Sequence, residues 1–148
     1  MLLSHPSTRP STNFAHQARA AALLWALLQP PLALAEPIDA ATETLLVNAV
    51  EAAFELDLYN RRCRGDQSGR RSENLNKELV SRYRMTVIDV QDDYFPEGYY
   101  RDAQARMQAD FLQALRELGG CEGAKAAGLR DALRTRYQDA MAEVSSQP

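Results

Sequence analysis

Histidine is missing from most of this sequence, because both histidines, His5 and His16, lie in the first 35 residues. The remaining 113 residues lack the side chain on which Ser-His-Asp and Cys-His catalysis, histidine-bound zinc and covalent haem attachment depend. Any acid and base chemistry there falls to carboxylates. We therefore expect a protein that is not an enzyme and that holds no cofactor.

Acidic residues are absent before Glu36, and two arginines, Arg9 and Arg19, precede an apolar run over residues 20–28. A pair of prolines and several small side chains then lead up to Ala35. A basic segment, a short apolar segment and a small-residue end are typical of a secretory signal peptide. We expect signal peptidase to cleave after Ala35.

This cleavage site divides the chain into a signal peptide, residues 1–35, and a single mature domain, residues 36–148. The apolar run has nine residues, whereas a membrane-spanning helix needs about 20. A lipoprotein carries cysteine at the first mature position, where this chain has glutamate. We therefore expect an exported protein, periplasmic or secreted, with no stable membrane anchor after cleavage.

Negative charge exceeds positive charge in the mature segment, which keeps 15 basic and all 20 acidic residues, a formal charge of −5. Nucleic-acid binding relies on many Lys and Arg contacts to phosphates, so we expect no nucleic-acid partner. A chain of this length buries roughly two-thirds of the surface that it exposes when unfolded. One hydrophobic core is therefore sufficient.

Apolar residues recur at helical spacing in four stretches, and glycine and proline fall mostly between them. Asp39 is placed to cap the first stretch. The stretches cover about residues 40–62, 72–94, 100–118 and 122–144. Because helices joined by short connections pack as antiparallel neighbours, we predict an all-α, antiparallel four-helix bundle in a single domain.

Cysteine occurs only twice, at Cys63 and Cys121, 58 residues apart. This spacing excludes CxxC redox chemistry, and a metal site needs more ligands than two thiols. The two cysteines fall in connections that an antiparallel bundle places at the same end. We therefore predict one structural disulfide, which on the chain-entropy estimate stabilises the fold by about 4 kcal/mol.

Several carboxylates cluster at the end of the second helical stretch. Asp89, Asp92 and Asp93 occupy positions i, i+3 and i+4, and Glu97 follows shortly after. They form a candidate cation site, although the DxDxDG pattern of calcium loops is absent. The alternative is a solvated acidic edge whose last members cap the following helix.

Two further clusters are candidate partner-binding surfaces. Five arginines surround the first cysteine and provide either an anion-binding patch or compensation for a helix dipole; they are Arg61, Arg62, Arg64, Arg70 and Arg71. Four aromatic residues surround a proline turn and provide either a contact face or a seal for the end of the bundle; they are Tyr94, Phe95, Tyr99 and Tyr100.

The helix order, with Cys63 after the first helix and Cys121 before the last, resembles the small pilotin-type proteins of type II secretion. In those helical bundles a disulfide ties the end of an early helix to the last helix, and small acid-stress chaperones share much of this plan. The resemblance implies a non-enzymatic cell-envelope protein that binds a protein partner, as an accessory, chaperone-like or assembly factor. The alternative is a periplasmic carrier of a small ligand or cation.

Overall fold

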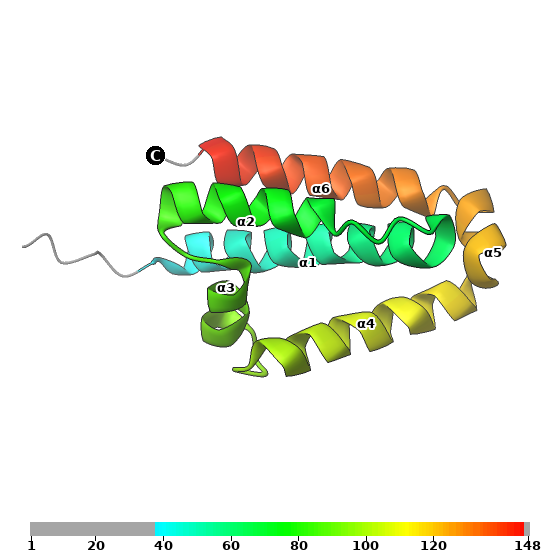
Figure 1. Cartoon of the computed structure of the whole chain (residues 1–148), viewed down its shortest axis with the longest axis horizontal. Coiled ribbons are helices and arrows are strands. Elements are labelled where there is room, and N and C mark those ends of the chain that lie inside the picture. Colours follow the sequence, from blue (N-terminus) through cyan, green and yellow to red (C-terminus); the bar gives the residue numbers. More distant parts are fainter. Residues whose placement is uncertain (1–37, 147–148) are drawn as a thin grey trace, which may run out of the picture. The chain divides into compact units, whose positions relative to one another are not determined.

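The computed structural model describes residues 38–146, and these residues form helices and no strand (Figure 1). The predicted signal peptide and its cleavage site lie outside the described residues. Within the described region, no helix is long and apolar enough to span a bilayer. The helices in chain order are α1 (Ala40–Arg64), α2 (Arg70–Tyr83), α3 (Val87–Tyr94), α4 (Tyr100–Glu117), α5 (Gly120–Ala126) and α6 (Leu129–Ser146).

The second predicted helix is divided into α2 and α3, because the chain turns sharply at Arg84. This residue has a φ of 58°, in the left-handed region that ends a helix. Thr86 then begins α3 with a capping box, in which its hydroxyl accepts from the Asp89 N–H at 3.1 Å and the Asp89 carboxylate accepts from the Thr86 N–H at 2.7 Å. Local capping therefore overrides an apolar period that continues across the break.

The fourth predicted helix is likewise divided, into α5 and α6. Gly128 lies between them with a φ of 68°, a conformation that glycine adopts at little cost. Inside α5, Gly123 is so close to the Leu118 carbonyl oxygen that a β-carbon would lie 1.6 Å from it. The all-helical class is therefore confirmed, whereas the four-helix bundle is not, because residues 38–146 form six helices.

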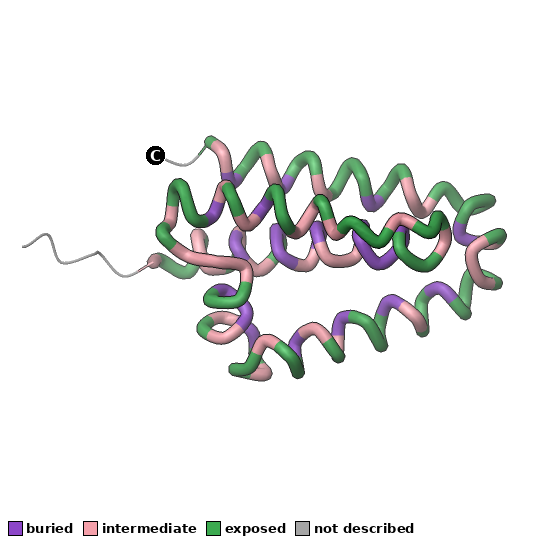
Figure 2. The backbone as a smooth tube through the Cα atoms, viewed as in Figure 1, coloured by how far each residue is buried: buried purple, intermediate pink, exposed green. Residues whose placement is uncertain are grey.

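Helix α1 is the central element and packs against α2, α3, α4 and α6. Helices α2 and α6 lie alongside it and also pack against each other (Figure 1). Buried positions recur along most of α1 (Figure 2), including Leu46, Ala49, Val50, Ala52 and Ala53. A helix that is covered on several sides needs a broad apolar surface, and α1 has one between Leu46 and Tyr59.

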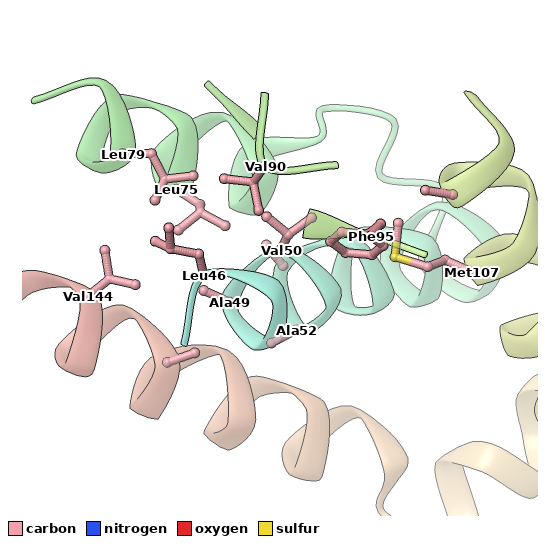
Figure 3. Close-up of a cluster of buried hydrophobic side chains, with 13 residues drawn as sticks. Leu46, Ala49, Val50, Ala52, Leu75, Leu79, Val90, Phe95, Met107 and Val144 are labelled. Carbon is pink, nitrogen blue, oxygen red and sulfur yellow. The ribbon is translucent and has the colours of Figure 1, made fainter. Parts of the chain in front are cut away.

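The core has two parts, one along each half of α1. In the first part, Leu46 and Val50 meet side chains from four other helices, drawn in Figure 3; these include Leu75, Leu79, Val90, Met107 and Val144. In the second part, Leu56, Leu58 and Tyr59 pack against Phe111, Leu115, Ala124 and Leu133. Burying each large aliphatic side chain stabilises the fold by about 1.5–3 kcal/mol.

Ion pairs connect α4 to α6 across α1. Glu51 of α1 lies 3.6 Å from Arg106 of α4 and 3.3 Å from Arg136 of α6. Arg106 also pairs with Glu97. Exposed ion pairs of this kind contribute about 0–1 kcal/mol each, so they orient α4 more than they stabilise it.

Candidate functional site

The disulfide joins the last turn of α1 to the first turn of α5. Cys63 and Cys121 are bonded to each other, with their Cα atoms 5.4 Å apart, and residues 38–146 contain no free cysteine. The predicted pairing is therefore confirmed. A polar hollow of about 400 Å³ lies beside the bond, and its lining includes Arg64, Lys125 and Arg130.

The five predicted arginines do not form one patch, because the fold distributes them over several surfaces. Arg61 and Arg62 are exposed and line a groove toward α4, whereas Arg64 lines the hollow beside the disulfide. Arg70 is exposed at the first residue of α2, and Arg71 is half-buried. Three of them, at the end of α1, offset the negative pole of its dipole.

Arg71 belongs to a buried polar contact between α1 and α2. The Asp57 carboxylate, 5% exposed, accepts hydrogen bonds from the backbone N–H groups of Arg71, at 3.2 Å, and Ser72, at 2.9 Å. Gly69, at the N-cap position of α2, has no side chain for this purpose. Asp57 therefore caps α2 from the neighbouring helix, and its negative charge lies at the positive pole of the α2 dipole.

The loop between α1 and α2 is held by Asp66. Hydrogen bonds from the Ser68 side chain and backbone N–H, followed by one from the Arg71 guanidinium, lower the pKa of the Asp66 carboxyl to about 2. The Asp66 carboxylate lies 3.0 Å from the Ser68 nitrogen and 3.1 Å from Arg71 Nη1. Asp66 thus orders the loop between α1 and α2, and its carboxylate remains ionised well into the acid range.

Two adjoining hollows form a groove between α1, the start of α2 and α4. One is about 300 Å³ and the other about 160 Å³, and they share Leu58 and Arg61. We call this the α1–α4 groove; its residues are Phe54, Asp57, Leu58, Arg61, Arg62, Gln67, Gly69, Ser72, Val87, Gln104, Gln108, Phe111 and Leu112.

The lining of the α1–α4 groove combines apolar and cationic groups. Apolar side chains come from three helices, and glutamine amides add uncharged donors and acceptors. Arg61 and Arg62 supply positive charge, while Asp57, the single carboxylate of the lining, is already bonded to the start of α2. The groove therefore suits an apolar segment that carries negative charge near the two arginines.

The predicted aromatic cluster is mostly packed into the fold. Phe95 is buried in the first core, and Tyr94 is half-buried against the same core. Tyr99 is 43% exposed and makes an edge-to-face contact with Tyr100, their ring centroids 5.2 Å apart. Arg101 lies over the Tyr100 ring. Of the four aromatic side chains, Tyr99 therefore presents the largest exposed fraction.

The predicted acidic cluster is distributed among local structural contacts. Asp89 belongs to the capping box of α3, where hydrogen bonds from the backbone and then the side chain of Thr86 lower its pKa. Asp92 accepts from the Tyr100 N–H at 2.6 Å and so caps α4, Glu97 pairs with Arg106, and Asp93 is exposed. Across residues 38–146, no group of three or more His, Cys, Asp or Glu side chains is arranged to hold a metal ion.

Comparison of the chain with protein-family models, curated proteins and solved structures gave no match.

Two buried polar residues of α1, Asp57 and Asn60, were missed by sequence reasoning. Both lie on α1 and are buried, at 5% and 2% exposure. The available signal was their position next to apolar residues of α1, with Asp57 between Leu56 and Leu58 and Asn60 directly after Tyr59, because a polar side chain on a buried face needs a partner.

Proposed function

We propose that this chain is an exported, non-enzymatic protein that acts by binding another protein through the α1–α4 groove. The observation that carries the proposal is the groove itself, in which Leu58 and Arg61 connect two hollows on the central helix. Grooves between helices accommodate amphipathic peptide segments, whose apolar side chains enter the hollows. The envelope partner expected from the sequence would present such a segment.

The chemistry of the groove specifies the segment further. Phe111 and Leu112 of α4 and Leu58 of α1 line its larger hollow, while the guanidinium groups of Arg61 and Arg62 lie at the same hollow. An occupant with two or three apolar side chains and a carboxylate near these arginines satisfies both features. We therefore propose a short, apolar segment with acidic residues at one end as the occupant.

Photo-crosslinking in the native envelope tests this proposal. A photoreactive residue placed at Leu112, in the groove, is expected to capture a partner, whereas one placed at Val80, exposed on α2, is not. The double variant Arg61→Glu/Arg62→Glu should abolish the Leu112 crosslink, and Arg116→Glu, on the exposed surface of α4, should leave it intact. A crosslink that survives the double variant in a folded protein would refute the groove as the binding surface.

Export is part of the same proposal and has a separate test. The disulfide supports export, because such bonds form and persist in oxidising compartments. We propose cleavage after Ala35, which gives a mature protein that starts at Glu36. Intact-mass analysis of exported protein should give the mass of residues 36–148 less two hydrogen atoms for the disulfide; a mass that includes residues 20–28 would contradict export by cleavage.

We propose that the four longest helices keep the antiparallel order of the predicted bundle. Helices α1, α2, α4 and α6 would alternate in direction, with α3 and α5 as short connecting helices. The Cys63–Cys121 bond supports this order, because it brings the end of α1 to the end of the α4–α5 connection.

A further inference from the structure

A second cavity, of about 200 Å³, lies between α1, α2 and α6, outside the α1–α4 groove. A water molecule takes up about 30 Å³ in the liquid, so the cavity has room for a few heavy atoms only. It is smaller than the sites of about 300–1,000 Å³ that hold drug-sized molecules. Its polar lining consists of Asn60, Arg71, Arg130, Arg134, Tyr137 and Gln138.

Asn60 lines this cavity and carries an unused hydrogen-bond donor. The residue is 2% exposed, and within residues 38–146 its Nδ2 atom has no hydrogen-bond partner. A buried donor without a partner is unfavourable, and an acceptor that reached it would remove that penalty. An oxygen acceptor is therefore the group that would complement Asn60.

The charge of the lining defines that acceptor further. The lining contains three arginines and no carboxylate. Neighbouring carboxylates neutralise part of this charge: Arg71 Nη1 lies 3.1 Å from Asp66 and 3.7 Å from Asp57, and Arg134 lies 3.0 Å from Asp131. The Arg71 pair includes the buried Asp57, whereas the Arg134 pair is exposed and constrains its guanidinium less.

Arg130 supplies the remaining positive charge. Within the described part of the chain it forms no ion pair, although it is only partly exposed. Tyr137 adds a hydroxyl group, and burial, partly opposed by a hydrogen bond with Asn74, raises its pKa and keeps it protonated. The lining of this cavity thus combines cations and neutral donors and contains no carboxylate.

We propose that this cavity binds a small oxyanion, either a carboxylate or a single phosphate group, with Asn60 and Arg130 as its principal donors. Charge-assisted hydrogen bonds from guanidinium groups are the strongest contacts that proteins make to such anions. The site is separate from the α1–α4 groove, so the outcome of its test does not depend on the proposed protein partner.

Thermal unfolding of the mature protein, titrated with inorganic phosphate or acetate at constant ionic strength, tests the site. A saturable rise in melting temperature with either anion, and not with chloride, is the expected result. A response to phosphate alone identifies a phosphate group as the ligand, and a response to acetate identifies a carboxylate. No saturable response to either anion overturns the proposal.

Variants distinguish specific anion binding at this cavity from nonspecific electrostatic attraction of anions to the protein surface. Arg130→Gln should weaken the affinity for the responding anion by about tenfold or more, the loss expected for one charge-assisted hydrogen bond. Asn60→Ala should also weaken it, although no charge changes. Arg116→Gln, which removes an exposed charge on α4, should have no effect. Equal losses in Arg130→Gln and Arg116→Gln would refute the site.

Discussion

Asp57 of α1 caps α2 from a buried position, so its removal should lower the free energy of unfolding more than the loss of an exposed cap. Asp57→Ala removes two hydrogen bonds, at 3.2 and 2.9 Å, from the backbone N–H groups of Arg71 and Ser72. Hydrogen bonds to charged groups contribute about 1.5–3 kcal/mol each, and the substitution also removes the buried partner of the Arg71 guanidinium. We therefore expect the free energy of unfolding to fall by about 3 kcal/mol or more.

The matched control is Asp39→Ala, which removes the exposed cap of α1. Asp39 is exposed and accepts a hydrogen bond from the Thr42 N–H at 2.7 Å, so its loss should destabilise the fold less than the loss of the buried Asp57. Asp57→Asn, which keeps the shape and one acceptor oxygen, should fall between the two alanine variants. Urea denaturation with a common slope gives all three values. If Asp57→Ala costs no more than Asp39→Ala, the buried cap does not stabilise the fold as we argue.

Three further predictions concern the disulfide, a glycine and acid stability. Replacing Cys63 and Cys121 with serine should lower the free energy of unfolding by about 4 kcal/mol, measured by urea denaturation; a loss below about 1 kcal/mol would contradict the loop-closure argument. Gly123→Ala should destabilise the protein, although alanine favours helices, because its β-carbon would lie 1.6 Å from the Leu118 carbonyl oxygen; an unchanged melting temperature would show that α5 shifts at no cost. The pKa of Asp66 is about 2 in the folded protein and ordinarily 3.8, so its contribution to the free energy of unfolding is present above pH 3.8 and is lost as the pH falls to about 2. In urea denaturation, an Asp66→Asn variant should therefore differ less from the wild type in free energy of unfolding at pH 2 than at pH 6.

Sequence patterns predicted the parts of the fold that depend on apolar periodicity. The first helix was expected over residues 40–62 with Asp39 as its cap; α1 covers Ala40–Arg64, and Asp39 accepts from the Thr42 N–H. The disulfide was also predictable, since helix order and cysteine position led to the same pairing. The helix prediction rests on local signals, whereas the disulfide prediction rests on the order of the helices along the chain.

The break between α2 and α3 was not predicted, because the apolar periodicity of the sequence continues unchanged where the chain changes direction. Leu79, Tyr83 and Val87 keep four-residue spacing across the break at Arg84. A Thr-x-x-Asp capping box beginning at Thr86 was the signal that could have located the start of α3.

The candidate site was predicted in part. Arg61 and Arg62 do lie at a groove, but their neighbours in sequence point to other surfaces. The α1–α4 groove and the cavity at Asn60 result from the angles between helices, which side-chain packing sets after the helices have formed.

The position of α4 in the fold has a consequence for its motion. Its packing partners are α1, α3 and α5, and the disulfide fixes the chain just beyond its C-terminal end. Segments with few neighbours open as units at less than the global free energy of unfolding. We therefore expect amide hydrogens of α4 to exchange faster than those of α1, and reduction of the disulfide to speed that exchange further. The thiol redox state of the compartment would then set how often this helix detaches, and with it the lifetime of anything held against its inner face.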